Sequence, residues 1–368
     1  MLIALAFNVR LAGANGGRAG GSAGVSAENP VFGSFVASCD PEEEFDSPAT
    51  IQAMAGVVEG LGYEVDLLGE GEAMLHRLLR GPRPDLVFNI AEGAGGLRSR
   101  EARVPAVLEM LGIPHTGSDP LTLAVTLDKD CAKRLVASAG VATPAWVLYE
   151  GDWDAIAPQA AALPFPVFIK PAYEGSSKGI LDCCLIERLE DLPSALDQLR
   201  RACSGPVLVE EFIDGDELTV GLLGNDPPAV LGVMRVLPKN LTAGPFIYTL
   251  DVKHNYLERV EYECPARIAA DDMAAVRSAA LASWRALGCR DVARLDFRLR
   301  DGVAYFLEAN PLPGLSPVTG DLVILARAMG VEYPELISRI LQAALDRYRQ
   351  LSRAGRSGAS ILSAVGSA

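Results

Sequence analysis

The 368-residue sequence has little histidine, and its few cysteines do not show the spacing of a metal site. It contains three histidines and seven cysteines, and no CxxC pair. Structural zinc sites need clustered cysteine and histidine ligands, and disulfide-rich folds show even sets of cysteines at regular spacings. The sequence therefore predicts neither a zinc site nor a disulfide framework, and we expect its cysteines to be reduced thiols.

Positive charge is also scarce. Lysine and arginine number 33 against 47 aspartates and glutamates, which gives a formal net charge of −14 at pH 7. Nucleic acids and anionic membrane surfaces are bound by clustered basic side chains that replace counterions. We therefore expect small molecules as partners, and neither nucleic acid nor membrane.

Long apolar runs are missing as well. A membrane-spanning helix needs about 20 predominantly apolar residues, whereas the apolar run at the N-terminus ends after Phe7. No basic leader precedes that run, so we interpret it as a first β-strand rather than as a targeting segment. These features predict a soluble, cytoplasmic protein.

Apolar residues are nevertheless plentiful. They make up 49% of the sequence, and a chain of this length is expected to form two or three domains. Strands and helices alternate in the first part, with strands expected at 1–10, 63–68 and 84–90 and helices at 48–62 and 100–114. This alternation is typical of an α/β domain with a parallel sheet, which we assign to residues 1–117.

Residues 12–24, AGANGGRAGGSAG, interrupt this domain. Glycine at this density invites comparison with a dinucleotide-binding loop, but the spacing GxGxxG is absent. We interpret the stretch as a mobile loop.

The rest of the chain divides into two more units and a tail. We assign residues 118–204 to a central lobe and residues 205–350 to a C-terminal lobe. The expected elements are helices at 127–140, 189–203, 273–289 and 333–350, an edge strand at 141–149, two strands joined by an acidic turn within 205–225, and a hairpin at 292–314. Residues 351–368 predict a disordered tail.

The expected hairpin, RLDFRLRDGVAYFLEAN, carries charged residues at alternate positions. If its loop has an odd number of residues, for example 301–303, Asp296 lies directly opposite Glu308, and period two adds Arg294 and Asn310 to the same face. Carboxylate and amide oxygens of this kind suit Mg²⁺ or Mn²⁺. The alternative is a solvated charged face, although facing like charges destabilise a sheet unless a cation lies between them.

A second candidate site is the segment PVFIKPAYEGSSKGI. Its lysine, Lys170, precedes Gly175, so the order differs from the Walker A pattern GxxxxGK[ST]. The small residues 175–179 permit close approach to a phosphate. Lys129, in the first turn of a helix, could add charge at an end that favours anions. Alternatively, the segment is an ordinary loop and Lys129 a surface lysine.

A third candidate is the strand exit in VLVEEFIDGDELTV. Glu210 and Glu211 end the strand, and Glu217 follows four residues after Ile213. Backbone groups at such an exit can bind an adenine edge while Glu217 accepts hydrogen bonds from ribose hydroxyls.

The order of these features resembles an ATP-grasp ligase, and the sequence resembles the D-alanine–D-alanine ligase family. Six segments carry the resemblance over residues 84–345: IPHTGSDPLTLAVTLDK, KPAYEGSSKGI, VEEFIDGDELTVGLLG, EYECPA, ALGCRDVARLDF and LEANPLPGLSP. The resemblance implies a mixed α/β and α+β fold, in which a parallel-sheet domain precedes two lobes that clamp ATP.

The resemblance also implies roles for individual residues. For ATP it implies Lys129, Lys170 and Lys253 at the phosphates, Ser176 and Ser177 in the loop that closes over them, Glu210, Phe212 and Ile213 in the adenine pocket, and Glu217 at the ribose. For the metal ions it implies Asp296, Glu308 and Asn310. For catalysis and the amino acids it implies Arg294, with Ser176, Lys253 and Glu44 assisting, and Gly314 and Ser316 at the carboxylate of the second substrate.

The implied reaction joins two small amino acids through an acyl phosphate, as in peptidoglycan biosynthesis, and the implied assembly is a homodimer. The departures from the family pattern lie at positions that bind the amino-acid substrates rather than ATP. Glu92 stands where the family has histidine, His254 stands where it has tyrosine, and arginines 98 and 100 stand near the place of the family's acidic pair. Three functions therefore stay open: a D-alanine–D-alanine ligase, a ligase of other amino acids or a small peptide, and a non-catalytic ATP-binding relative.

Overall fold

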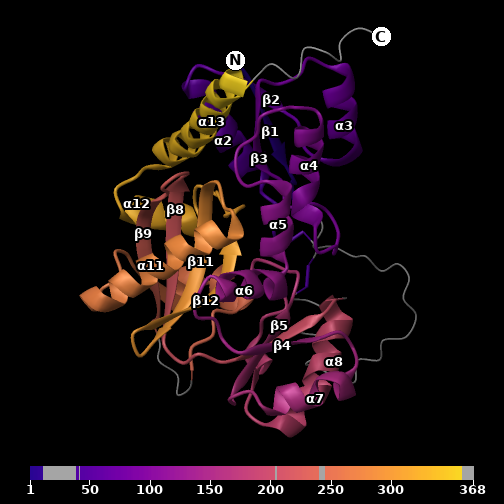
Figure 1. Ribbon diagram of the computed structural model, residues 1–368, viewed down its shortest axis with the longest axis vertical. Coiled ribbons are helices and arrows are strands. Elements are labelled where there is room, and N and C mark those ends of the chain that lie inside the picture. The colour runs from indigo at the N-terminus through magenta and orange to yellow at the C-terminus, as the bar shows by residue number, and fades with distance from the viewer. Residues whose placement is uncertain (11–38, 41, 204, 240–244, 359–368) are drawn as a thin grey trace.

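The computed structural model describes residues 1–10, 39–40, 42–203, 205–239 and 245–358. Within these ranges the chain forms three sheets, which belong to three units stacked along the long axis in Figure 1. The N-terminal domain lies at the top, the C-terminal lobe in the middle and the central lobe at the bottom. The loop predicted at 12–24 lies outside the described residues.

The N-terminal domain is built on a parallel sheet, as predicted. Its strands are β1 (Leu2–Phe7), β2 (Glu64–Leu67) and β3 (Leu86–Ile90), in the order β2-β1-β3. Its helices are α2 (Pro48–Gly60), α3 (Gly71–Arg80), the 3-10 turn η1 (Arg100–Ala102) and α4 (Arg103–Met110). The side chain of Ser47 accepts a hydrogen bond from the Thr50 amide and caps α2, whose first residue is proline.

Alternate residues of β1 face two different cores. Ile3 and Leu5 pack in one core with α2 and with the last helix, α13. Ala4 and Ala6 pack in another core with α3 and α4. The period of two along the strand thus produces a sheet covered on both faces.

The central lobe holds a four-stranded antiparallel sheet. Its strands are β4 (Trp146–Tyr149), β5 (Val167–Pro171), β6 (Leu185–Ile186) and β7 (Val207–Glu211), in the order β4-β7-β5-β6. Its helices are α7 (Trp153–Ala161) and α8 (Leu192–Cys203), with 3-10 turns at Asp182–Cys184 and Leu189–Asp191. The predicted boundary between residues 204 and 205 is wrong, because β7 pairs with β4 and β5 and therefore belongs to this sheet.

The C-terminal lobe holds a five-stranded antiparallel sheet in the order β10-β9-β8-β11-β12. The strands are β8 (Asp216–Gly224), β9 (Ala229–Pro238), β10 (Val260–Glu263), β11 (Asp291–Arg300) and β12 (Val303–Asn310). The helices that follow β9 in the chain are α9 (Leu250–His254), α10 (Tyr256–Arg259), α11 (Ala270–Leu287) and α12 (Asp321–Ala328). The acidic turn predicted within 205–225 does join two strands, β7 and β8, but these strands belong to different sheets and do not form a hairpin.

Of two helices assigned to the central lobe, the first lies between the N-terminal domain and the C-terminal lobe, and the second packs on the C-terminal lobe. These are α5 (Pro120–Leu127), which the sequence did not predict, and α6 (Lys129–Ser138). The α6 residues Ala132 and Val136 belong to the core between α11 and the five-stranded sheet. Burial of this apolar face, rather than position in the chain, decides where α6 lies.

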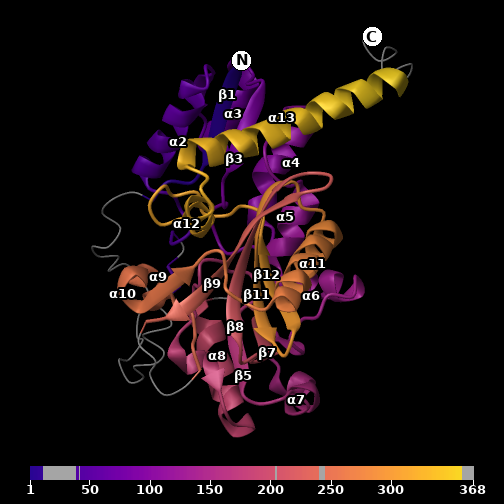
Figure 2. The same ribbon diagram turned by 90° about the vertical axis from the view of Figure 1, so that its left-hand side faces the viewer.

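The final helix, α13 (Tyr333–Gly358), is longer than predicted. The disordered tail expected from residue 351 is therefore wrong for residues 351–358, which are helical. Residues 359–368 of that tail lie outside the described residues. Figure 2 shows α13 lying across the N-terminal sheet. Its residues Leu336 and Ile340 are at most 1% exposed there, so the last helix of the chain completes the first domain.

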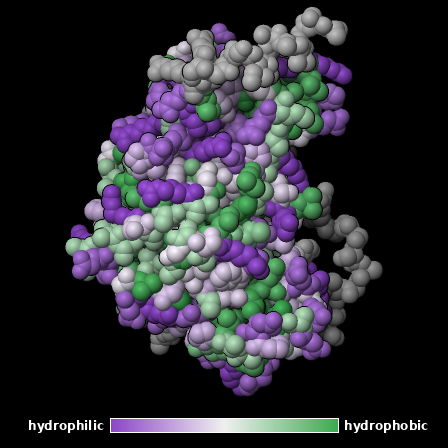
Figure 3. Space-filling view, viewed as in Figure 1, coloured by the Kyte–Doolittle hydropathy of each residue, from purple (hydrophilic) through white to green (hydrophobic). Residues whose placement is uncertain are grey.

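The face shown in Figure 3 carries separate hydrophobic patches between hydrophilic residues. Among the described helices, none combines the length and the apolar character that a membrane crossing requires.

Replacing Leu336 with alanine should destabilise the protein. The leucine is fully buried, so its truncation leaves a cavity, and the expected loss is about 2–5 kcal/mol of unfolding free energy. Leu351 on the same helix is 58% exposed, and Leu351→Ala should change stability by less than about 0.5 kcal/mol. Urea denaturation followed by circular dichroism measures both; equal losses would contradict the assigned packing of α13.

Candidate active site

The β11–β12 hairpin brings the predicted carboxylates together. Asp296 pairs with Glu308, and Arg294 pairs with Asn310. The expected odd-numbered loop is wrong, however: Arg300 pairs with Val303 around a two-residue turn, and an irregularity between Asp296 and Phe297 shifts the register by one. The β-bulge thus supplies the extra residue that the loop was expected to supply.

Cations and hydroxyls hold this pair of carboxylates. Arg294 donates from Nη2 to Asp296 Oδ2 at 2.9 Å, and Thr219 Oγ1 donates to Asp296 Oδ1 at 2.9 Å. On the other side, Lys129 Nζ lies 3.4 Å from Glu308 Oε2. Asn310 donates from Nδ2 to Asp296 Oδ2 at 3.2 Å. The predicted ligands therefore converge at one point.

The two carboxyl groups have different proton affinities. Burial raises the pKa of Asp296 to about 6, against the opposing effect of Arg294. Burial also acts to raise the pKa of Glu308, but Lys129, Lys170 and Arg294 outweigh it and lower that pKa to about 2. Glu308 is thus ionised at any ordinary pH, whereas Asp296 loses its proton as the pH rises through about 6.

This donor set fits a magnesium ion. Mg²⁺ prefers one or two carboxylates, with substrate phosphates and water completing its shell. Asp296 and Glu308 provide two facing carboxylates, and the amide of Asn310 lies beside both of them. The group thus offers hard oxygen donors in a half-buried position, as such an ion requires.

Two lysines of the cleft share one buried glutamate. Lys170 Nζ lies 2.6 Å from Glu210 Oε1, and Lys133 Nζ lies 2.7 Å from Glu210 Oε2. Burial lowers the pKa of Lys133 to about 8, although Glu210 opposes this effect. Glu210, expected in the adenine pocket, thus positions the two ammonium groups.

The loop after Lys170 is tied to the N-terminal domain. Ser176 and Ser177 have φ values of 48° and 57°, a left-handed conformation that residues other than glycine rarely adopt. Lys178 Nζ lies 2.6 Å from both Glu44 Oε2 and Glu174 Oε2, and the amide of Gly175 donates to Glu44 Oε1 at 2.9 Å. The loop is therefore held in a closed position.

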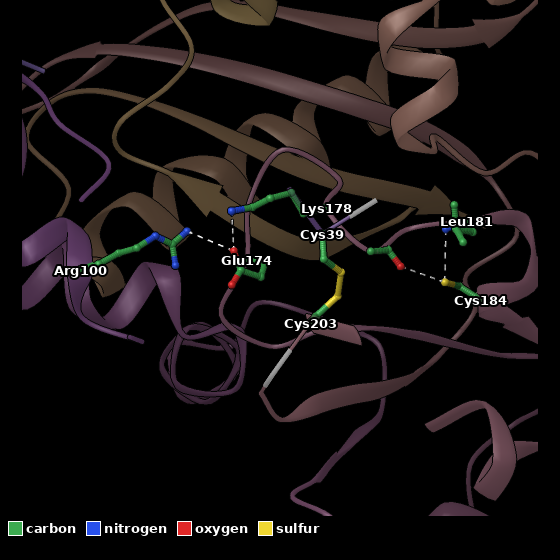
Figure 4. Close-up of a disulfide and its surroundings, with 8 residues drawn as sticks. Cys39, Arg100, Glu174, Lys178, Leu181, Cys184 and Cys203 are labelled. Carbon is green, nitrogen blue, oxygen red and sulfur yellow. Dashed lines mark hydrogen bonds and ion pairs between the residues drawn. A yellow bond between two sulfur atoms is a disulfide. The ribbon is translucent and has the colours of Figure 1, made fainter. Parts of the chain in front are cut away.

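Arg100 completes this network. It donates to Glu44 Oε2 at 2.7 Å and to the Tyr173 carbonyl at 2.7 Å, and it lies 3.6 Å from Glu174 Oε2. Figure 4 shows Arg100 and Lys178 converging on Glu174. Although burial acts to raise the pKa of Glu44, Arg100 and Lys178 lower it overall, so its carboxylate is charged and already paired.

The same view shows a disulfide between Cys39 and Cys203 next to this network. It corrects the expectation that all cysteines are reduced. The two residues are 164 positions apart, and their pairing depends on the approach of the central lobe to the N-terminal domain. No sequence spacing could have indicated it.

Two cavities meet at Glu308, one of the predicted metal ligands. The smaller, of about 120 Å³, lies between the two antiparallel sheets and is lined by Lys170, Phe212, Ile213 and Glu217. The larger, of about 670 Å³, lies toward the N-terminal domain. Side chains that line both are Ser176, Lys253, Arg294, Glu308 and Asp321.

The other predicted residues line these cavities too. Glu217 accepts a hydrogen bond from Arg298 at 2.6 Å within the smaller one, and Ser177 Oγ donates to the Tyr248 carbonyl at 3.4 Å. Gly314 and Ser316 line the larger one, where Ser316 Oγ accepts a hydrogen bond from the amide of Thr319 at 3.2 Å.

Sequence reasoning missed two charged residues of the cleft, Arg298 and Asp321, and the buried Lys133, which shares Glu210 with Lys170. Lys133 stands one helical turn after Lys129, and this spacing could have indicated a shared face. Arg298 follows Arg294 and Asp296 at period two, which was visible in the hairpin. Asp321 lies 2.8 Å from Arg294 and 3.8 Å from Lys253, contacts that only the fold reveals.

Comparison with known proteins places this geometry in a family. Residues 135–342 match the family model described as D-ala D-ala ligase C-terminus. The D-alanine–D-alanine ligase of Desulforudis audaxviator is 33% identical over 80% of this chain and 92% of its own length. The chain belongs to the D-alanine–D-alanine ligase family.

Two further comparisons concern a relative in sequence and a solved structure of similar fold. The protein y4sG of Sinorhizobium fredii, which has no assigned function, is 33% identical over 84% of this chain and 91% of its own length. A crystal structure of the D-alanine–D-alanine ligase of Bacillus anthracis complexed with ATP has a TM-score of 0.67, covering 95% of this chain and 99% of that one at 21% identity. The fold is therefore the expected ATP-grasp fold.

Replacing Glu210 with glutamine should strongly destabilise the protein. Two buried ammonium groups would lose their shared counter-charge, at a cost of about 3–5 kcal/mol. The neighbouring Glu211 pairs with the partly exposed Arg300 at 2.8 Å, and Glu211→Gln should cost no more than about 1 kcal/mol. Urea denaturation compares the two, and a similar small loss in both would refute the buried role of Glu210.

Replacing Asp46 with asparagine should change the dependence of stability on pH. Burial raises the pKa of Asp46 from 3.8 to about 7, so in this range the folded chain holds a proton that the unfolded chain has released. The stability that this group contributes is complete below pH 3.8 and is lost as the pH rises through 7.

The variant lacks this loss, so its stability relative to the wild type should increase between pH 4 and pH 8. Denaturation series at several pH values measure the difference. Glu59→Gln, at an exposed position of α2, is the control and should follow the wild-type profile. Parallel profiles for Asp46→Asn and the wild type would disprove the assignment.

Proposed function

We propose that this protein is an ATP-dependent ligase that joins the carboxyl group of one amino acid to the amino group of another; D-alanine, which the relatives' names give, is the first substrate to test. The observation that carries the proposal is the convergence of Lys129 and Lys170 on the carboxylate pair Asp296 and Glu308. The names of the relatives support it.

The nucleotide fits between the two antiparallel sheets. Phe212 and Ile213 line the smaller cavity together with Met234, and they offer apolar contacts to a base. Glu217 stands where ribose hydroxyls would donate to its carboxylate. Lys170 and the loop containing Ser176 then reach the phosphates, since backbone amides and ammonium groups favour anions.

Asp296, Glu308 and Asn310 would hold Mg²⁺, or Mn²⁺ in its place. The ion, when bound, neutralises charge on the phosphates and makes the terminal one a better electrophile. The lysines of this chain add to that neutralisation from the opposite side: Lys129 lies beside Glu308, and Lys253 lies beside Asp321.

The larger cavity receives the amino acids. A carboxylate is a poor electrophile, so the first substrate attacks the terminal phosphate and becomes an acyl phosphate, releasing ADP. The amine of the second substrate then attacks the acyl carbon, and phosphate leaves. Arg294 faces both cavities and stabilises the oxyanion that forms in this second step.

The closed loop protects the acyl phosphate. Its contacts through Lys178 and Gly175 with Glu44 cover the site, and water that entered would hydrolyse the intermediate. Ser176, at the tip of this loop, lines both cavities. Because the reaction consumes ATP, we further propose a cytoplasmic location; a homodimer stays a prediction of the family resemblance.

Turnover should require both carboxylates of the hairpin. Asp296→Asn and Glu308→Gln each remove one charge that the metal and its phosphates need, and each should lower ATP-dependent phosphate release at least about 100-fold. The assay supplies ATP, Mg²⁺ and pairs of D- or L-amino acids, beginning with D-alanine.

Asp271→Asn is a suitable control, because this exposed carboxylate lies in the first turn of α11 on the outer side of the sheet. Normal turnover by Asp296→Asn and Glu308→Gln would refute the metal assignment. If the wild type releases no phosphate with any amino acid pair yet binds ATP, the protein is a non-catalytic relative. Release with pairs other than D-alanine selects a ligase of the same chemistry with other substrates.

A further inference from the structure

Glu44, which the family resemblance assigns to catalysis and the amino acids, already has partners within the protein. Glu44 accepts hydrogen bonds from Arg100 at 2.7 Å and from the Gly175 amide at 2.9 Å, and it pairs with Lys178 at 2.6 Å. Two cations and an amide satisfy its carboxylate. A cationic group in the larger cavity must therefore find its partner elsewhere.

Three other carboxyl groups of that cavity have no partner. Asp46, Glu92 and Glu101 line it, and within the described part of the chain no hydrogen bond or ion pair reaches any of their side chains. Glu101 is only 7% exposed. An unpaired, buried carboxyl group is costly when it is ionised, so it either keeps its proton or pairs with a ligand that supplies positive charge.

The three groups come from one edge of the N-terminal sheet. Asp46 forms a parallel bridge with Val9, just beyond the end of β1, Glu92 follows β3, and Glu101 lies on η1. Ligands of open α/β sheets bind at the carboxyl ends of the strands, which is where these side chains gather.

The charges of these groups affect one another's pKa values. Burial and then the neighbouring Glu101 and Glu44 raise the pKa of Glu92 well above its usual range. Burial and Glu44 raise the pKa of Glu101 to about 8. A bound cation would relieve both effects by supplying the missing positive charge.

A single metal ion does not match this arrangement. Of the described histidine, cysteine and acidic residues, the only group of three whose ligand atoms all lie within 4.8 Å of one another is Asp128, Asp130 and Cys131, which stands apart from the three carboxyl groups. Three carboxyl groups whose oxygens lie farther apart than 4.8 Å suit an extended organic cation better than a single ion. A cavity of about 670 Å³ has room for one, since small-molecule sites measure roughly 300–1,000 Å³.

We propose that Asp46, Glu92 and Glu101 select a first substrate that carries a cationic side chain, that is, a diamino acid rather than alanine. Its α-ammonium and side-chain ammonium groups pair with these carboxylates, while its carboxylate faces Arg294 and the phosphates. This inference rests on the proposed function and specifies the substrate class of the same site.

Lysine and norleucine test the proposal, because their side chains have similar length and differ in the terminal charge. The full-length protein, with Mg²⁺ and a non-hydrolysable ATP analogue, is titrated calorimetrically with each amino acid in both D and L forms. We expect one enantiomer of lysine to bind at least 10-fold more tightly than norleucine or alanine of the same handedness. Equal affinities, or tighter binding of norleucine or alanine, would overturn the proposal.

Variants then connect the preference to the carboxyl groups. Glu101→Gln should reduce the ratio of lysine to norleucine affinity at least 10-fold, and Glu92→Gln should do the same if Glu101→Gln does not fold. Glu109→Gln, whose side chain is 49% exposed on α4, should retain the wild-type ratio. An unchanged ratio in the folded cavity variants would equally overturn the assignment.

Phosphate release with the same amino acids separates this proposal from the proposed function. Release with alanine or norleucine at a rate equal to that with lysine contradicts the selection of a cation but leaves the ligase activity intact. Absence of release with every amino acid contradicts the ligase activity, whereas the binding preference for lysine is measured independently of turnover.

Discussion

Two negative charges face each other across the β11–β12 hairpin, and the surrounding cleft is arranged around them. Asp296 and Glu308 are cross-strand neighbours, an arrangement that on its own destabilises a sheet. Arg294, on β11, and Lys129, at the start of α6, reach them from two segments that are distant in the chain. The pair of carboxylates thus connects the C-terminal sheet to the start of α6 through these contacts. A metal ion bound between the carboxylates would neutralise the pair further.

The same requirement explains the other buried charges. Each lysine of the cleft has an acidic partner: Lys170 and Lys133 share Glu210, and Lys178 lies between Glu44 and Glu174. Charges taken out of water are tolerated only when they are paired in this way. The unpaired carboxyl groups of the larger cavity depart from this rule, and a departure of this kind is characteristic of a surface that awaits a ligand.

Local patterns predicted much of the fold. Alternation along β11 identified Arg294 and Asp296 on one face, and Pro48 identified the start of α2, because both signals depend on neighbours in sequence. Lobe boundaries were less predictable. Strand β7 joins β4 and β5, and α13 covers the first sheet, because apolar surfaces distant in sequence fit together.

The site was predictable to a similar extent. The order of the motifs, through the family resemblance, predicted that Lys129 and Glu308 lie close together. The bulge that sets the register of the hairpin is a backbone irregularity that no residue type marks. The pairing of Glu44 with Arg100 and Lys178 joins three segments and depends on the approach of two units. Sequence patterns do not contain that information.

The Cys39–Cys203 bond has a mechanical consequence. It connects the segment just before Glu44 to the last residue of α8, so the N-terminal domain and the central lobe are joined covalently as well as by charge. While the bond is intact, the two units cannot separate at this point beside the loop. Reduction would leave the ion pairs of Lys178 with Glu44 and of Arg100 with Glu174 as the connection between them.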